Sequence, residues 1–311
     1  MYHEYAAYHK ATWGDNFHRD DFLPLFNAEH FHAEEIVELV KMSGARYIVP
    51  FSKHHDGFCL WDSDYSMRDA ADMYPGRDLT AELVEACRKE GIPHGFYFSV
   101  EEYEYPLIGR NDSLMIRYWS EEIAPDTART RNRDGEVMGA FHSDLHNRML
   151  SGKIPVKDFI NQMIVPQAKE FIDKYDPDIL WFDGEWSHPA GYYRTPEIVA
   201  YFYNRSEGRK EVVSNDRLGA GTREGHGDFY TSETDEVVER LEEPWEENRS
   251  MSESYGFNRS DSSGKYLTAD ELVEMLVRIV ARGGTNGDCP QKSPRRCWVI
   301  PPQGRVITPG Y

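Results

Sequence analysis

Cysteines and long apolar runs are both scarce in this chain. Only four cysteines occur among 311 residues, and no two of them have C-x-x-C spacing. We therefore expect no zinc knuckle and no disulfide framework, and we interpret Cys59, Cys87, Cys289 and Cys297 as unlinked thiols. No apolar run is long enough to span a bilayer, and the first residues lack the pattern of a signal peptide. The sequence gives no sign of a membrane span.

Basic residues are also in short supply. The chain has 35 Lys and Arg against 54 Asp and Glu, which gives a formal net charge of -19. A surface of that charge repels nucleic acid and anionic membranes, so we expect neither as a partner. The length fits one α/β barrel or two smaller domains, and a single domain is the simpler interpretation.

The stretch Asp178–Trp186 organises the rest of the sequence. Its apolar run from Ile179 to Phe182 is bounded by a Pro-Asp turn and a Gly, as is typical of a strand buried on both faces. Asp183 ends this strand. In a parallel α/β barrel the residues at the C-terminal ends of the strands form the floor of the active site, so Asp183 stands at a catalytic position. The alternative is a carboxylate that only caps the following turn.

Polar and ionisable residues follow the other predicted strands in the same way. Those strands span Arg46–Phe51, His94–Val100, Glu211–Asn215 and Asp228–Thr231. Because the C-terminal ends of parallel strands meet at one edge of a sheet, we expect the residues there to lie together. They are His54 and His55, Tyr97 with Glu101 and Glu102, Asn215-Asp216-Arg217, and Ser232-Glu233.

Helical segments alternate with these strands, which predicts an α/β barrel or a doubly wound sheet. Apolar residues recur at helical spacing in 33–43, 79–89 and 156–175, with Pro166 predicted to kink or split the third segment. Two further helices begin at Thr195-Pro196 and at the capping box of Thr268 and Glu271. Two stretches without periodicity, 1–20 and 103–151, are predicted as loops. The second contains Arg129, Arg131 and Arg133, which suit either solvated surface or a phosphate grip.

Two carboxylates at different strand ends suit the hydrolysis of a glycosidic bond. One of Asp183 and Glu233 would attack or stabilise an oxocarbenium-like centre while the other, held protonated, gives its proton to the leaving oxygen. The competing interpretation of Glu233, within an acidic run, is a solvated helix start. The group His54-His55-Asp56 also has a metal interpretation, although neighbouring strand residues point to opposite faces, and a plain pair of structural histidines is a third reading.

Six motifs in order resemble the α-L-fucosidases of glycoside hydrolase family 29, from about Asp15 to Gly284. They are Lys53-His54-His55-Asp56-Gly57-Phe58-Cys59-Leu60-Trp61, Leu180-Trp181-Phe182-Asp183-Gly184, Asn215-Asp216-Arg217, Asp228-Phe229-Tyr230-Thr231-Ser232-Glu233, Pro244-Trp245-Glu246 and Ser254-Tyr255-Gly256-Phe257-Asn258. The resemblance implies a (β/α)8 TIM-like barrel and a retaining double displacement, without metal or organic cofactor. It implies an exo-acting hydrolase that releases α-linked L-fucose from a fucosylated glycan or oligosaccharide.

The resemblance also implies a role for individual residues. Asp183 would be the nucleophile and Glu233 the acid/base, with Glu102 the runner-up for the second role. The sugar would contact His54, His55, Tyr97, Arg217 and Tyr255, the last of these near the methyl group of fucose. Family members of this kind would be secreted, periplasmic or lysosomal.

Both ends of the chain depart from the family pattern. The first barrel strand with its sugar-binding histidine is not recognisable before Met1-Tyr2-His3, and residues 285–311 form an irregular tail where the family continues with an apolar strand. We therefore expect residues 1–284 to form an incomplete barrel with two unpaired edges. An inactive fragment or sugar-binding remnant remains an alternative to the active enzyme, as does a retaining glycosidase for another sugar. The oligomeric state stays open.

Overall fold

The computed structural model describes the chain in several separate ranges. Within them Cys59 and Cys87 are free and buried, while Cys289, Cys297 and the predicted tail at 285–311 lie outside. No helix of the described part is long and apolar enough to cross a membrane. The described residues are 2–14, 17, 19–66, 68–102, 129–131, 137–140, 158–233, 243–252, 255 and 263–282.

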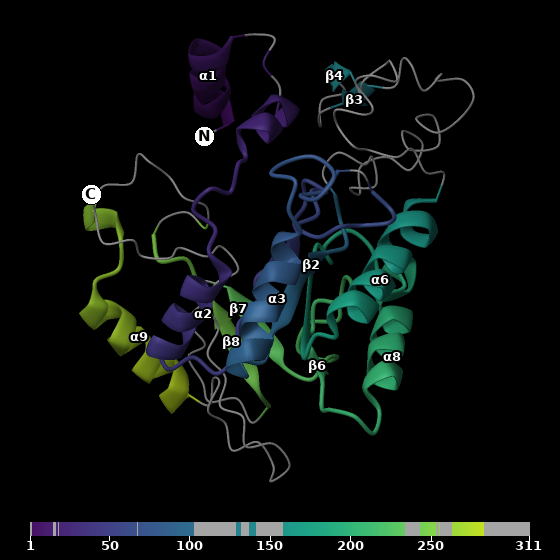
Figure 1. The fold of residues 1–311 in the computed structure, drawn as a ribbon, viewed down its shortest axis with the longest axis vertical. Helices are drawn as coiled ribbons and strands as arrows, with labels where there is room; N and C mark the ends of the chain where they lie inside the picture. The colour runs from purple at the N-terminus through teal and green to yellow at the C-terminus, as the bar shows by residue number, and fades with distance from the viewer. Residues whose placement is uncertain are drawn as a thin grey trace.

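Six strands form two parallel sheets, and within each sheet the strands lie side by side in chain order (Figure 1). The larger has the order β1-β2-β5-β6, and the smaller pairs β7 with β8. A parallel bridge between Asn215 and Phe229 links the two. The strands are β1 (Phe51–Lys53), β2 (Gly95–Ser99), β5 (Ile179–Asp183), β6 (Val213–Ser214), β7 (Tyr230–Glu233) and β8 (Trp245–Asn248).

The register places the ends of β2 and β5 about where the sequence predicts them, whereas β1 begins at its predicted end, Phe51, and β7 continues to Glu233 instead of ending at Thr231. Tyr97 lies opposite Trp181 and Ser99 opposite Asp183, so β2 and β5 end at the same edge. The sheets do not close into a ring within the described residues, so the eight-stranded barrel is not confirmed. A side-chain contact does join the two outer strands: Tyr47, just before β1, donates a hydrogen bond of 3.1 Å to Glu246 on β8.

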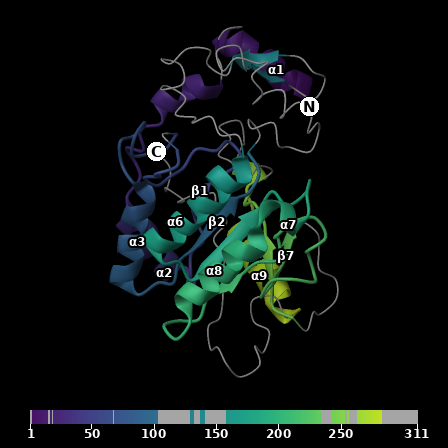
Figure 2. The same ribbon diagram turned by 90° about the vertical axis from the view of Figure 1, so that its right-hand side faces the viewer.

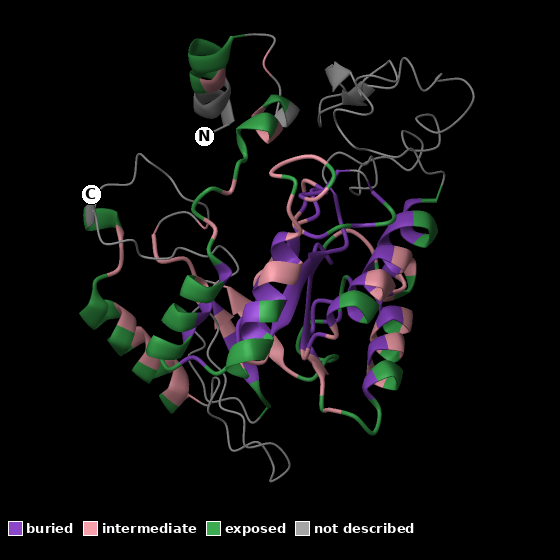
Figure 3. Ribbon diagram, in the orientation of Figure 1, coloured by how far each residue is buried: buried purple, intermediate pink, exposed green. Residues whose placement is uncertain are grey.

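The two faces of the larger sheet have different partners, because alternate residues of a strand point to opposite sides. Phe96 and Phe98 belong to one apolar core with Phe171 and Phe202 of the covering helices. Tyr97 and Trp181 belong to a second core on the other face. Figure 2 shows the helices along the outside of the sheet, and Figure 3 shows their buried residues turned toward it. These helices are α2 (Ala33–Met42), α3 (Leu79–Glu90), α6 (Val165–Tyr175) and α8 (Thr195–Ser206).

Local signals in the sequence account for most of these helices. Gly91 ends α3 with φ 65°, a left-handed conformation that costs glycine little. The segment with Pro166 is divided as predicted, into a π-helical piece, Ile160–Ile164, and α6, near whose start the proline lies. Thr268 and Glu271 form the predicted capping box of α9 (Ala269–Ala281).

Several predictions for individual elements were wrong. Residues 1–20 are not mainly loop: α1 (Tyr2–Trp13) is a helix, whose apolar residues follow no single stripe that periodicity could detect. Within 103–151 the backbone forms an antiparallel pair, β3 (Arg129–Arg131) with β4 (Val137–Ala140), while Arg133 lies outside the described residues. Thr195 is not the N-cap of α8, because the cap is Arg194 with φ 57°. The remaining short elements are η1 (Arg19–Leu25), α7 (Ala190–Tyr193) and η4 (Ser263–Lys265).

Candidate active site

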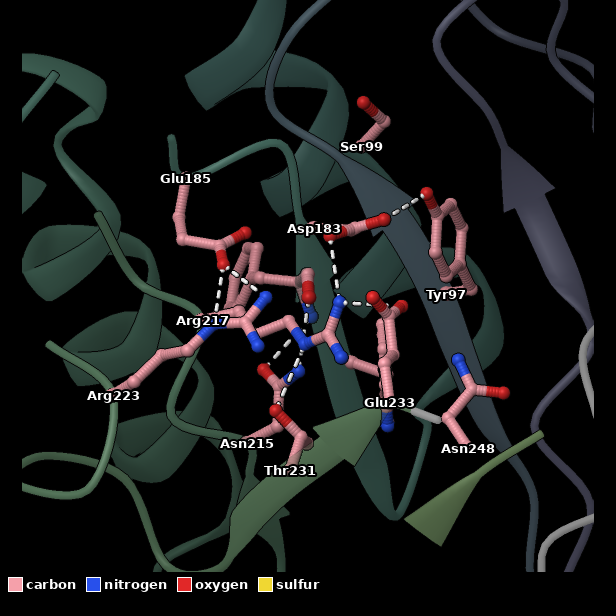
Figure 4. A network of polar contacts seen from close by, with 12 residues as sticks. Tyr97, Ser99, Asp183, Glu185, Asn215, Arg217, Arg223, Thr231, Glu233 and Asn248 are labelled. Carbon is pink, nitrogen blue, oxygen red and sulfur yellow. Dashed lines mark hydrogen bonds and ion pairs between the residues drawn. The ribbon is translucent and has the colours of Figure 1, made fainter. Parts of the chain in front are cut away.

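Asp183 ends β5 in a buried position with hydrogen-bond donors on both oxygens (Figure 4). The Tyr97 hydroxyl donates to Oδ2 at 2.6 Å, and Arg217 Nη1 donates to Oδ1 at 3.1 Å. His55 Nε2 lies 3.6 Å from Oδ2. Burial opposes the charge of the carboxylate, but hydrogen bonding to His55 and Tyr97 and the charge of Arg217 outweigh it. The pKa of Asp183 therefore lies below its usual range, and the group is an anion at neutral pH.

Arg217 joins Asp183 to the second predicted carboxylate. Its Nη1 also donates to Glu233 Oε1 at 3.0 Å, and Figure 4 shows the guanidinium between the two acids. The Arg217 side chain is fully buried, whereas that of Glu233 is 38% exposed. Burial works against the arginine charge, but Asp183, Glu233 and Glu185 outweigh it and raise the pKa of Arg217. One permanent cation thus serves both acids.

A network of side chains fixes Arg217 from the β6 end. Its Nε donates to Thr231 Oγ1 at 2.8 Å, and that hydroxyl donates in turn to Asp216 Oδ1 at 2.8 Å. The side-chain amide of Asn215 pairs with the backbone of β5 as a neighbouring strand would. Its oxygen accepts from Phe182 N and its nitrogen donates to Phe182 O, both at 2.9 Å. The motif Asn-Asp-Arg therefore places its arginine by anchoring the first two residues to β5 and β7.

The predicted histidines follow β1 directly and lie beside Tyr97. His54 stacks on the Tyr97 ring with centroids 5.1 Å apart and an angle of 10°. Burial, and the neighbouring His55, lower the pKa of His54 to about 4, so its imidazole is neutral at physiological pH. His55 is held through Nδ1 by Ser99 Oγ at 2.5 Å and by the carbonyl of Glu101 at 3.1 Å. Its other nitrogen faces Asp183.

Tyr255 lies beside the same charges, as its sequence motif indicates. Its hydroxyl donates to the carbonyl of Asn248 at 3.1 Å. Burial and the charge of Glu233 raise the pKa of Tyr255 to about 12, with Arg217 acting in the opposite direction. The phenol is therefore a neutral hydrogen-bonding group next to Glu233.

Glu102 has different surroundings from those of the other predicted residues. Its Oε1 accepts from Lys53 Nζ at 2.8 Å, and the same ammonium donates to Gln167 of α6 at 3.1 Å. Lys53 also lies 4.5 Å from the centroid of the Phe98 ring, on the face of the sheet that the helices cover. The structure thus places Glu102 in a separate ion pair, away from the side chains that surround Asp183.

Sequence reasoning did not single out three residues beside the site. Glu185, two residues after Asp183, is buried and ion-paired with Arg223 at 2.6 Å. Burial and the charge of Asp183 raise the pKa of Glu185, against the opposing effects of its own backbone amide and Arg223. Trp186 is 50% exposed and packs against His55 with ring centroids 5.0 Å apart. The only signal for Glu185 and Trp186 was their place in the same Asp-Gly-Glu-Trp stretch, and Arg223 had none.

One donor atom each of His54 and Asp56, two members of the predicted metal group His54-His55-Asp56, is already engaged. His54 Nδ1 accepts from His55 N at 2.8 Å, and Asp56 Oδ1 accepts from Phe58 N at 3.3 Å. Among the described residues no group of three or more His, Cys, Asp or Glu side chains is arranged to hold an ion.

Known proteins resemble the chain in both sequence and structure. The family model described as Alpha-L-fucosidase matches residues 1–286. The plasma alpha-L-fucosidase of Homo sapiens is 33% identical over 285 residues, which are 90% of this chain and 53% of that protein. The alpha-L-fucosidase of Dictyostelium discoideum is 28% identical over 279 residues, covering 89% of this chain and 53% of that protein.

The same likeness is found among solved structures. The crystal structure of the Thermotoga maritima alpha-fucosidase in complex with fucose matches with a TM-score of 0.64 and 27% identity, covering 90% of this chain and 55% of that one. The chain thus spans about half the length of the curated relatives it matches. The resemblance carried by the six sequence motifs is confirmed: the chain belongs to the α-L-fucosidase family.

Proposed function

We propose that the protein is an exo-acting retaining α-L-fucosidase that releases α-linked L-fucose from a fucosylated glycan. Asp183 is its nucleophile and Glu233 its acid/base. The family membership supports the substrate, and the contacts of the two carboxylates support the mechanism.

The observation that carries the mechanism is the nitrogen atom shared by the two acids. Since Arg217 Nη1 contacts one oxygen of each carboxylate, those oxygens cannot lie farther apart than the two contacts placed end to end, about 6 Å. Retaining glycosidases hold their carboxyl groups roughly 5–5.5 Å apart, and inverting ones roughly 6.5–9.5 Å apart to admit a water molecule. This upper limit on the two facing oxygens is compatible with the closer arrangement of the retaining enzymes and so supports direct attack by Asp183 on the sugar.

In the first step an oxygen of Asp183 bonds to the anomeric carbon while the bond from that carbon to the leaving oxygen breaks. Glu233 gives its proton to the leaving oxygen and becomes a carboxylate. In the second step a water oxygen attacks the anomeric carbon, Glu233 takes the water proton, and Asp183 departs as a carboxylate. Arg217 faces one negative charge at each stage, on Asp183 before attack and on Glu233 afterwards, which suits a cation held between them.

The remaining residues suit the recognition of a sugar ring. Because Nδ1 of the neutral His54 accepts from His55 N, its Nε2–H is left to donate to a sugar hydroxyl, and His55 and Tyr97 lie next to the attacking carboxylate. Trp186 offers a half-exposed apolar face at the rim, beside His55. Aromatic rings and a few fixed polar groups are the usual composition of such pockets.

The test is turnover of an aryl α-L-fucoside by the purified chain, followed by NMR to identify the first-formed anomer of fucose. We expect release of the aryl group with α-L-fucose formed first. Initial formation of the β-anomer would refute the retaining mechanism. Turnover of another aryl glycoside in a panel, but not the fucoside, would favour a different sugar. Specific binding of fucose without turnover of any member would favour a sugar-binding remnant.

A further inference from the structure

Glu246 lies in the interior beneath the candidate site, on β8, and is only 2% exposed. Both of its oxygens are occupied by donors that come from distant strands. Trp181 Nε1 donates to Oε1 at 2.9 Å, and the Tyr47 hydroxyl donates to Oε2 at 3.1 Å. A carboxyl group enclosed in this way has no access to a substrate oxygen, so it is not a candidate for proton transfer to the sugar.

The Trp181 indole, which is hydrogen-bonded to Glu246, packs against two residues of the candidate site, Arg217 and Tyr97. The guanidinium carbon of Arg217 lies 4.5 Å from the Trp181 ring centroid. The Tyr97 ring is stacked on the same indole, with centroids 5.5 Å apart and an angle of 23°. Arg217 and Tyr97 are also the two side chains that donate to opposite oxygens of Asp183.

We propose that Glu246 is a positioning residue for the proposed fucosidase reaction. By accepting the indole N–H it fixes the plane of Trp181, and that plane sets where Arg217 and Tyr97 meet Asp183. A buried indole N–H without a partner is costly, so the hydrogen bond selects one orientation of the ring about its χ2 bond. Because a displacement of about 1 Å among reacting groups can cost roughly 100-fold in rate, a turned indole would be felt at Asp183.

The charges around Glu246 are compatible with this role. Burial raises the pKa of Glu246 to about 7, against the opposing effect of its bonds to Trp181 and Tyr47 and the charge of Arg217, with Asp216 adding to the rise. The carboxyl can lose or keep its proton near neutrality and still accept the indole N–H. A carboxamide in its place can accept the same bond.

The second donor supplies a matched control. Tyr47 bonds to the other oxygen of Glu246, not to the one that accepts the Trp181 N–H, and packs in the same inner core. Tyr47→Phe therefore removes one hydrogen bond of Glu246 and leaves the Trp181 bond in place. It measures what a purely structural loss at this carboxyl does to the enzyme.

The experiment measures kcat and KM for an aryl α-L-fucoside, together with thermal unfolding, in Glu246→Gln, Glu246→Leu, Tyr47→Phe, Trp181→Phe and the double variant Trp181→Phe/Glu246→Leu. We expect Glu246→Leu to lower kcat by about 10- to 100-fold with little change in KM. Glu246→Gln and Tyr47→Phe should stay within about threefold of the parent, since each keeps an acceptor for the indole N–H. In the Trp181→Phe background, Glu246→Leu should cost much less, because the bond it breaks is already gone.

The positioning role would be overturned if the effects of Trp181→Phe and Glu246→Leu on kcat were additive. It would also be overturned if Tyr47→Phe and Glu246→Leu lowered kcat equally and in proportion to their losses in melting temperature. A Glu246→Gln variant as slow as Glu246→Leu and restored by azide would overturn it in favour of proton transfer. If the parent protein turns over no glycoside, the proposed function fails separately. In that case the Trp181 indole N–H is followed by NMR, with its resonance assigned by its loss in Trp181→Phe. We expect Glu246→Leu to speed the exchange of this proton with solvent. An unchanged exchange rate would overturn the inference.

Discussion

Two groups of buried ions lie on opposite faces of the larger sheet, and they differ in how completely their charges are enclosed. On the helix-covered face, Lys53 and Glu102 have side chains that are 0% and 5% exposed, with Gln167 as a further partner. On the other face, Arg217 is paired with two carboxylates, Asp183 and Glu233, and the Glu233 side chain is partly exposed to solvent. The first pair is matched charge for charge, whereas the second has one cation for two acids.

This difference shows why a buried charge by itself does not identify a catalytic group. A closed pair such as Lys53–Glu102 leaves no vacant position for a reactant, and its charges stabilise each other against burial. In the Arg217 cluster one carboxylate can become neutral while the guanidinium keeps the other carboxylate as its ionic partner. We therefore expect variants of the two clusters to fail in different ways, one in chemistry and the other in stability.

The largest effect is expected for Asp183→Ala. Loss of the nucleophile removes the covalent route and should lower kcat for an aryl α-L-fucoside by roughly 10⁴-fold, several kcal/mol in barrier. The fold should remain, since Arg217 keeps Glu233 as its partner. Azide should restore turnover in place of the carboxylate. Asp64→Ala, a change at a side chain that is 76% exposed, is the matched control. A variant that keeps a tenth or more of the activity would remove Asp183 from this role.

Glu233→Gln should have the next largest effect, and one that depends on the leaving group. General acid catalysis contributes roughly 10²- to 10⁴-fold, so a fucoside with a poorly acidic alcohol should lose that much. An activated aryl fucoside needs less help in departing and should lose less in its first step. Rates are measured for a series of leaving groups of increasing pKa. Equal losses across the whole series would contradict an acid role, and Glu274→Gln, on exposed α9, serves as the control.

Glu102→Gln tests the other ion pair and should act on stability. An unpaired Lys53 ammonium in this interior should lower the free energy of unfolding by about 3–5 kcal/mol, as measured by urea denaturation. The double variant Lys53→Met/Glu102→Leu should recover most of that loss, because it leaves no unpaired charge. Turnover per folded molecule should be nearly unchanged. A stable Glu102→Gln protein with a large, azide-sensitive loss of kcat would instead make Glu102 the acid/base.

The part of the site that could be predicted from the sequence depends on short-range signals. The apolar run of β5 and the polar residues after β1 and β6 each lie within a few neighbouring positions, so they predict where Asp183, His55 and Arg217 come together. The roles assigned to these residues stay predictions. The same local signals located α3 and α9 through their caps.

The remaining features depend on contacts that the sequence does not record locally. Strand β8 reads Trp-Glu-Glu-Asn, which has the polarity of a loop, yet Glu246 is buried by donors 65 and 199 positions away. Arg223 stands 38 positions from Glu185, so their ion pair had no local signature. The helix α1 was missed because its apolar residues form no stripe, which leaves only the weak preference of alanine and its neighbours for helix.

The smallest effect is expected from removing metal ions, and it tests whether Arg217 supplies the positive charge that the two acids need. Exhaustive treatment with EDTA should leave kcat and KM for an aryl α-L-fucoside unchanged. The reason lies in the arrangement of the donors: among the described residues no three His, Cys, Asp or Glu side chains are grouped to hold an ion, and Arg217 already places a cation between the two acids. The measurement compares treated protein with and without added zinc or calcium. A loss that either ion reverses would mean that a cation other than Arg217 acts at the site, and that the histidines serve as its ligands.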